Sequence, residues 1–168
     1  MKNLVLACAV VFATFSSHAS EAREMLFKAE DRPEAWCLAQ NIYYEARSSN
    51  LADQAAVADV VLNRVDDRRY PNTVCGVVRQ GKKNADGSMR RNMCQFSWYC
   101  DGKSDWPRDM DSWVNAQQVA YLMLYLNRYR GITEGATHYH ADYVNPSWAS
   151  SKQLVGTIGL HIYYRWVD

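Results

Sequence analysis

The chain has 168 residues, 48% of them hydrophobic, with 19 basic and 18 acidic side chains. This composition is that of a globular protein with a substantial core, and it excludes a disordered or fibrous chain. The formal net charge of +1 gives no electrostatic reason to expect nucleic acid or an anionic membrane as a partner.

The amino-terminal 19 residues have the pattern of a secretory signal peptide. Lys2 precedes an apolar run over 4–15, and small residues then lead to Ala19, after which we expect cleavage. The apolar run is too short to span a membrane, and Cys8 comes too early to follow a full hydrophobic segment as in a lipoprotein. We therefore predict a protein without a stable membrane anchor, exported to the periplasm or to the extracellular cell wall.

Residues 20–168 are expected to form a single domain, whose core covers about 34–165. About 149 residues remain after cleavage, a length at which one domain buries a substantial core. No internal repeat, low-complexity tract, heptad pattern or linker divides this stretch. We expect this domain to be a monomer.

The first helical pattern carries a glutamate near its end. Apolar residues recur at spacings of three and four over 35–46, as in an amphipathic helix. At about 100° per residue, Glu45 lies about 80° from the centre of the apolar stripe, at the seam between core and surface. A carboxyl group held against apolar and aromatic surface loses solvation of its charged form, so its pKa rises and it can keep a proton for a leaving group. Glu45 is thus a candidate catalytic acid, whereas a glutamate in isolation is usually an ordinary surface residue.

The second helical pattern is apolar nearly all the way round. Asn50 is a good N-cap, Asp53 lies in the first turn, and the pattern runs over 51–65. A helix of this kind is buried, so we place it at the centre of a small bundle beside the first helix. Thr73 can cap a further short helix over 74–80.

A polar stretch and an aromatic-rich stretch follow these helices. Residues 81–93 are polar and hold an Asp-Gly pair, which predicts a loop. The alternating, aromatic-rich stretch 94–100 then indicates a hairpin or an extended loop. Its Phe96 and Trp98 either stack on sugar rings or belong to the core, with their polar neighbours on the opposite face of the alternation.

The longest helical pattern and a β-like region complete the chain. Asp111 can cap a helix that runs to about Asn127 and whose aromatic residues we assign to the core. Beyond it, 136–140, 154–158 and 160–164 have the pattern of strands. The expected class is therefore α+β and mainly helical, with a small β-hairpin or sheet near the carboxyl terminus.

Four cysteines remain after cleavage, and an even number in an exported protein predicts two disulfides. Three pairings are possible. We favour Cys94 with Cys100, which closes a short aromatic loop, and Cys37 with Cys75, which ties the first helix to the segment after the second. Zinc is the alternative, but no two cysteines have the two-residue spacing of a zinc knuckle.

Several short motifs, in their order and spacing, resemble the cell-wall hydrolase family that includes the spore-cortex lytic enzymes of sporulating bacteria. In chain order they are Tyr44-Glu45-Ala46-Arg47, Val61-Leu62-Asn63-Arg64-Val65, Tyr70-Pro71, Gln95-Phe96-Ser97-Trp98, Gly135-Ala136-Thr137-His138-Tyr139-His140, Asn145-Pro146, Trp148 and Gly159-Leu160-His161. Each motif is weak by itself, but together they extend over roughly 34–164, nearly the whole mature chain.

The resemblance implies a compact, lysozyme-like fold, peptidoglycan glycan strands as the substrate and one catalytic glutamate, which falls on Glu45. No cofactor is expected. His138 and His140 stand where the spore branch of the family has aromatic residues, so the resemblance does not imply a role in germination.

A single carboxylate restricts the chemistry. Retaining and inverting glycosidases need two carboxyl groups, about 5 Å or about 6.5 to 9.5 Å apart, and the only loop candidates for a second one are Glu134 and Asp142. One glutamate suffices when the 6-hydroxyl of N-acetylmuramic acid attacks its own C1, which gives the 1,6-anhydro product of a lytic transglycosylase. Glu45 would first protonate the glycosidic oxygen and then accept the proton of that hydroxyl. The candidates for holding the sugars are Gln95, Ser97, Trp98, Thr137, Tyr139, His140 and Tyr143.

Two other classes of function remain open. His138 and His140 point to the same face of a strand, and with His161 or Glu45 they could form the three-ligand zinc site of a peptidoglycan amidase or peptidase. These histidines could instead be polar residues of a sugar groove or hydrogen-bonded partners within the fold. The third class is a non-catalytic glycan-binding module, which would bind the wall without releasing soluble fragments.

Overall fold

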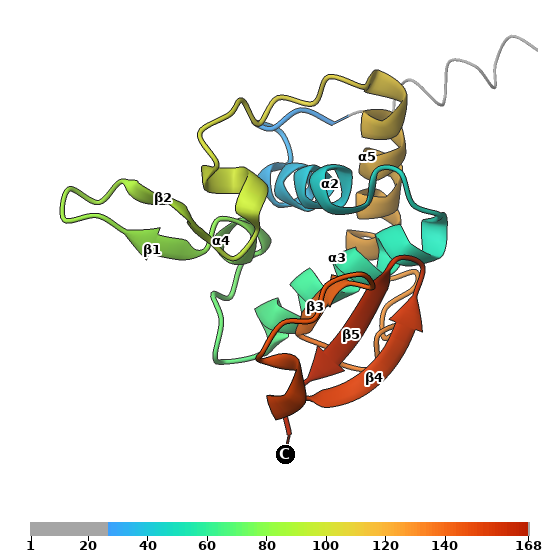
Figure 1. Cartoon of the computed structure of the whole chain (residues 1–168). Helices are drawn as coiled ribbons and strands as arrows, with labels where there is room; N and C mark the ends of the chain where they lie inside the picture. Colours follow the sequence, from blue (N-terminus) through green and yellow to red (C-terminus); the bar gives the residue numbers. More distant parts are fainter. Residues whose placement is uncertain (1–26, 168) are drawn as a thin grey trace, which may run out of the picture.

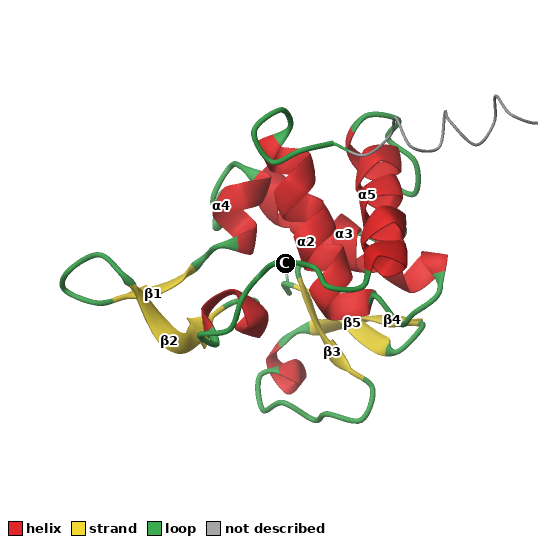
Figure 2. Cartoon of the chain, turned by 90° about the horizontal axis from the view of Figure 1, so that it is seen from above, coloured by secondary structure: helices red, strands yellow, loops and turns green. Residues whose placement is uncertain are grey.

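The computed structural model describes residues 27–167, so the predicted signal peptide over 1–19 lies outside the described residues. Helices α2 (Pro33–Ala46), α3 (Leu51–Asp66), α4 (Val74–Val78) and α5 (Met110–Leu124) pack together (Figure 1). One small sheet extends away from α4 as a hairpin, and a second sheet lies beside α3 (Figure 2). Within 27–167 no helix is both long enough and apolar enough to cross a membrane.

Helix α3 is the centre of the helical layer, as predicted. It packs against α2, α4, α5 and strand β4 (Gln153–Ile158). Asn50 caps its start, because its side-chain oxygen accepts a hydrogen bond from the Asp53 backbone N–H at 3.0 Å. Alanine and valine occupy positions 55–58 and 60–61, none of which has any solvent exposure. The helix is therefore enclosed on most sides, as its apolar pattern requires.

Helix α2 is joined to α4 at two points. It begins with Pro33 and carries Glu34 in its first turn. The Glu34 carboxylate accepts hydrogen bonds from the backbone N–H groups of Val74 (2.5 Å) and Cys75 (3.2 Å) at the start of α4. The Cys37–Cys75 disulfide joins the same two helices with its Cα atoms 5.2 Å apart, and this is the pairing expected from the sequence.

Residues 81–93 belong to a β-hairpin, where the sequence predicted a loop. Strands β1 (Gly81–Lys83) and β2 (Met89–Cys94) pair in antiparallel orientation. Asp86 stabilises the turn between them, because its carboxylate accepts a hydrogen bond from the Ser88 N–H at 2.9 Å. Side chains on both faces are mostly polar and exposed, so the strands lack the alternation by which a half-buried strand is recognised.

The segment after β2 is a 3₁₀ turn, η1 (Ser97–Cys100), and not the predicted hairpin or extended loop. The Cys94–Cys100 disulfide, also expected from the sequence, holds the two Cα atoms 6.0 Å apart. Six residues of extended chain would span about 20 Å, so the chain must turn. Phe96 and Trp98 are only 3% and 8% exposed and belong to the core. The alternation of burial is retained, because the polar residues before and between them are exposed.

Helix α5 begins and ends earlier than predicted. Its N-cap is Asp109, whose carboxylate accepts hydrogen bonds from the Ser112 N–H at 3.2 Å and hydroxyl at 2.6 Å, so Asp111 lies in the first turn. Asp109 and Asp111 are both suitable N-cap residues, so the sequence does not distinguish them. The backbone conformation before the helix decides which of them is the cap. The helix ends at Leu124, and Asn127 has a left-handed conformation with φ of 51°. Of the aromatic residues assigned to the core, Trp113 is buried and Tyr121 is half-buried, but Tyr125 is 47% exposed because the helix has ended before it.

The carboxyl-terminal sheet has the order β3-β5-β4 and is antiparallel throughout. Its strands are β3 (His138–Ala141), β4 and β5 (His161–Arg165), and a 3₁₀ turn, η2 (Ala149–Ser151), precedes β4. Gly159, with φ of 59°, makes the turn from β4 to β5. Tyr163 of β5 is fully buried in a cluster with Ala56 and Val60, which packs the sheet onto α3.

The two disulfides should differ in their contribution to stability. Their cysteines are 38 and 6 residues apart, and a longer closed loop removes more entropy from the unfolded chain. Replacing Cys37 and Cys75 by serine should lower the free energy of unfolding by about 4 kcal/mol, and replacing Cys94 and Cys100 should lower it by about 2 kcal/mol. Urea unfolding of the two double variants measures this difference, and equal losses would contradict it. Peptide mapping without reductant should recover both links.

Candidate active site

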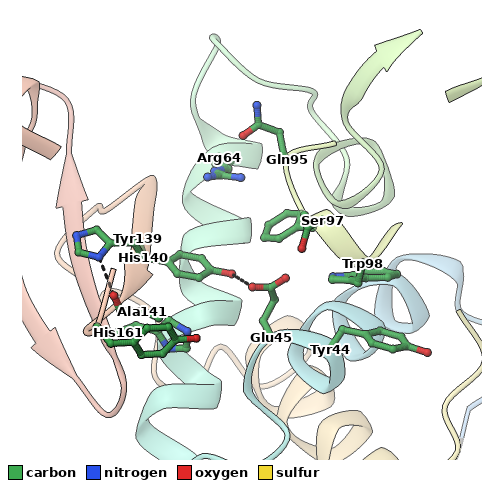
Figure 3. A pocket seen from close by; sticks show the side chains of 12 residues that line it. Tyr44, Glu45, Arg64, Gln95, Ser97, Trp98, Tyr139, His140, Ala141 and His161 are labelled. Atoms are coloured by element: carbon green, nitrogen blue, oxygen red, sulfur yellow. Dashed lines mark hydrogen bonds between the residues drawn. The ribbon is translucent and has the colours of Figure 1, made fainter. Parts of the chain in front are cut away.

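A cleft of about 370 Å³ opens where the end of α2 faces η1 and the carboxyl-terminal sheet (Figure 3). The residues proposed from the sequence that line it are Glu45, Gln95, Ser97, Trp98, Tyr139, His140 and Tyr143. They come from α2, from the segment around η1, from β3 and from the loop after β3. The tertiary structure therefore gathers residues from three separate parts of the chain around one glutamate.

Glu45 is the only acidic residue among the described residues that line the cleft. Its Oε2 accepts a hydrogen bond from the Tyr139 hydroxyl at 3.1 Å (Figure 3). Burial raises the pKa of Glu45 above its ordinary value, and the Tyr139 hydrogen bond and the interactions with His161 and Arg64 offset part of that rise. A raised pKa is the direction expected for a carboxyl group at the seam between core and surface. Glu45 therefore holds a proton more readily than a free glutamate does, as a general acid must.

Arg64 of α3 is a buried cation in the cleft wall, and the sequence analysis did not include it among the site residues. Its exposed fraction is 6%, and its Nε donates a hydrogen bond to the Thr137 carbonyl at 2.7 Å. The guanidinium also lies over the rings of Tyr70 and Phe96. Within the described chain it forms no ion pair, and its buried Nη1 has no hydrogen-bond partner. Burying a charge without an ion-pair partner costs folding free energy. The Arg64 guanidinium lies where its charge can stabilise the carboxylate form of Glu45.

Tyr44 and Trp98 form an aromatic wall on another side of Glu45 (Figure 3). Their rings are stacked with centroids 4.7 Å apart. The indole Nε1 of Trp98 donates a hydrogen bond to Asn41 Oδ1 at 3.4 Å, which holds the ring from the core side. Trp98 is therefore both a core residue and a cleft residue, so the two interpretations of this aromatic stretch are not exclusive.

One sugar-binding candidate and both candidates for a second carboxylate lie outside the cleft. Thr137 is buried, with its hydroxyl 2.9 Å from His138 Nδ1, and it lines a separate hollow with Asn63. Its candidacy for sugar binding is corrected for this reason. Glu134 and Asp142, the candidates for a second carboxylate, are exposed and do not line the cleft.

The three histidines of the zinc alternative do not converge. His138 and His140 share one face of β3, but His161 pairs with Ala141 in the ladder and therefore lies on the opposite face. His140 Nε2 lies 3.0 Å from the Tyr164 hydroxyl, on the side away from His161. Over 27–167 no three His, Cys, Asp or Glu side chains are grouped so that they could hold a metal ion. Strand register, which periodicity does not reveal, separates these side chains.

The sequence matches the model of the Cell Wall Hydrolase family over residues 48–164, which is well over half of the chain. This protein therefore belongs to the cell wall hydrolase family, as the resemblance of its motifs predicted. Glu45 lies just before the matched range, at the end of the preceding helix. No curated protein sequence matches the chain.

Solved structures with a similar fold include the catalytic domain of the germination-specific lytic transglycosylase SleB from Bacillus anthracis. It has 26% sequence identity and a TM-score of 0.57, and the match covers 79% of this chain and 93% of that domain. The catalytic domain of the Bacillus cereus SleB protein has 25% identity and a TM-score of 0.52, with 79% and 91% covered. These similarities confirm the predicted class, a mainly helical, lysozyme-like α+β domain with a small sheet near its carboxyl terminus.

The raised pKa of Glu45 predicts a specific dependence of stability on pH. A carboxyl group whose pKa is higher in the folded than in the unfolded state binds more protons when folded, so stability falls as the pH rises between the two values. Glu45→Gln lacks this loss, so it should be at least as stable as the parent, and its advantage should grow as the pH rises through that window. Urea unfolding over a pH series measures the difference. Glu134→Gln, at an exposed position, is the control and should follow the parent. Parallel curves for Glu45→Gln and the parent would contradict the raised pKa.

Proposed function

We propose that this protein is an exported lytic transglycosylase that cleaves peptidoglycan between N-acetylmuramic acid and N-acetylglucosamine, with Glu45 as its catalytic residue. The observation that carries the proposal is the environment of Glu45, the acid of the cleft, which favours its protonated form. The similarity to the catalytic domain of a germination-specific lytic transglycosylase supports the reaction type.

The proposed reaction needs one carboxyl group that acts twice. Glu45 first donates its proton to the glycosidic oxygen, and the bond between that oxygen and C1 of the muramic acid breaks. The 6-hydroxyl of the same muramic acid then attacks C1 and gives its proton to the Glu45 carboxylate, which restores the acid. The product carries a 1,6-anhydro ring, and no water is consumed.

Hydrolysis with two carboxylates fits this cleft less well. It needs a second carboxyl group about 5 to 9.5 Å from the first, and Glu45 has no acidic neighbour among the described residues that line the cleft. An attack by the substrate's own hydroxyl needs no activated water, because the nucleophile is already held beside the reacting carbon. This argument supports the anhydro product over a reducing end.

The other cleft residues are suited to hold the glycan and to support the acid. We assign sugar binding to Gln95, Ser97, Trp98, Tyr139, His140 and Tyr143. In addition, Tyr139 orients the Glu45 carboxyl through its hydrogen bond. The charge of Arg64 stabilises the carboxylate that Glu45 becomes after it has donated its proton.

We also propose that the protein acts outside the cytoplasm, in the periplasm or the cell wall, as a single domain over 20–168. The signal-peptide pattern over 1–19 supports export. The two disulfides support an oxidising compartment.

Glu45→Gln should remove most of the activity and leave the fold intact. Glutamine keeps the shape and hydrogen bonding of the side chain but cannot donate the proton, so turnover should fall by about 10² to 10⁴-fold. Release of soluble fragments from purified sacculi measures turnover, and circular dichroism checks the fold. Glu134→Gln and Asp142→Asn are matched controls at exposed positions and should cost much less. Activity within a few-fold of the parent in a folded Glu45→Gln protein would overturn the mechanism.

Mass spectrometry of digested sacculi should find 1,6-anhydro-muramic ends. Reducing ends would instead indicate a muramidase, because water would have completed the reaction. Freed stem peptides would indicate an amidase. A protein that binds sacculi and releases nothing would be a glycan-binding module, and each of these three outcomes contradicts the proposal.

A further inference from the structure

Asp53 of α3 and His161 of β5 form a buried pair beside the cleft, and the mechanism above does not use it. His161 Nδ1 lies 2.8 Å from Asp53 Oδ1, although the two residues are 108 positions apart in the chain. Asp53 has no solvent exposure, and His161 is 7% exposed. Such a pair either serves stability alone or holds one of its members ready for a ligand.

The surroundings of Asp53 determine which nitrogen of His161 carries the proton. The Asp53 carboxylate also accepts hydrogen bonds from the Tyr163 hydroxyl at 3.1 Å and from the Leu160 N–H at 3.2 Å. Burial acts to raise the pKa of Asp53, but the hydrogen bonds from His161 and from the Leu160 N–H, that of His161 foremost, help to lower it below its ordinary value. A carboxylate can only accept, so the shared proton lies on Nδ1 of His161. In the neutral imidazole, Nε2 is therefore an acceptor.

The Nε2 atom of His161 faces the cleft. His161 lines the same cleft as Glu45, and its ring packs edge-on against Tyr139 with centroids 5.1 Å apart. Within 27–167 Nε2 has no hydrogen-bond partner, yet it is not one of the buried polar atoms left without a partner. Nε2 thus retains open surface, and the open side of His161 is the cleft.

The turn before β5 is shaped around this pair. A Cβ atom at Gly159 would lie 2.5 Å from the Asp53 side chain, so a larger residue would force the carboxylate away. The next residue, Leu160, supplies the backbone N–H that binds Asp53. Turn, tyrosine and carboxylate together hold one imidazole in one orientation, as a preorganised binding group requires.

We propose that His161 is a substrate-binding residue whose Nε2 accepts a hydrogen bond from a hydroxyl of the sugar beside Glu45, and that Asp53 positions its ring. The inference rests on the proposed function, because its ligand is the glycan strand of that proposal. A hydrogen-bond acceptor suits a sugar ring, because the ring offers hydroxyl protons as donors. His161 thereby becomes a sugar contact next to Tyr139 in the cleft.

Glycan binding without turnover tests this assignment. In the Glu45→Gln background, His161→Asn keeps an amide donor near the position of Nδ1, so the bond to Asp53 can persist, but nothing replaces Nε2. Calorimetric titration with soluble, stem-free glycan strands should give a Kd about five- to tenfold higher, the worth of one hydrogen bond, with little change in Tm. His138→Asn is the matched control, because His138 lies outside the cleft lining, and its Kd should be unchanged.

The reverse substitution separates binding from stability. The amide oxygen of His161→Gln can reach the position of Nε2 but loses the bond to Asp53, so this variant should bind within a few-fold of the Glu45→Gln parent while unfolding more easily. An unchanged Kd in His161→Asn overturns the inference and leaves the proposed function intact. If the Glu45→Gln protein binds no glycan at all, both fail.

A spectroscopic measurement tests the same point without a substitution at His161. In ¹⁵N-labelled Glu45→Gln protein at neutral pH, Nε2 of His161 should resonate as an unprotonated nitrogen and Nδ1 as a protonated one. Addition of glycan should move the Nε2 resonance upfield as it accepts a hydrogen bond. A protonated Nε2 in the free protein, or no shift at saturating glycan, overturns the inference even if His161→Asn fails to fold.

Discussion

Two fully buried carboxylates on α3 determine how the carboxyl-terminal region, residues 130–163, docks onto the helices. Asp53 and Asp59 have no solvent exposure, so each must be satisfied by hydrogen bonds within the protein. Asp53 accepts from His161, Tyr163 and the Leu160 N–H, and Asp59 accepts from Arg130, the Gly131 N–H and the N–H and hydroxyl of Thr133. Breaking such a buried pair by removing one partner typically costs about 3 to 5 kcal/mol. The region from 130 to 163 is therefore held against α3 at two points along the helix.

This docking creates the cleft. Once the sheet lies on α3, Tyr139 reaches the Glu45 carboxyl from the side opposite Trp98 (Figure 3). Two influences on Glu45 then oppose each other. Burial favours its protonated form, whereas the charge of Arg64 favours its ionised form. A group that must first release a proton and then take one back needs this balance, since either influence alone would hold it in one state.

Two segments have a different secondary structure from the one predicted, and each has a physical reason. A hairpin with two solvated faces has no hydrophobic alternation, so 81–93 resembled a loop. The stretch 94–100 has the alternation of a strand, but the Cys94–Cys100 disulfide leaves it no room to extend.

The sequence by itself determined the features that depend on residues within a turn or two of each other. Helical periodicity indicated α2 and α3, Asn50 was recognisable as a cap, and Glu45 was expected at the edge of an apolar stripe. Only the tertiary structure decided that His161 lies on the face of the sheet opposite His140, that Thr137 turns away from the cleft and that Asp53 orients an imidazole 108 residues away. Periodicity reports which face of a single element is buried, whereas register and long-range hydrogen bonds depend on how two elements meet, and that is set by the packing of the whole core.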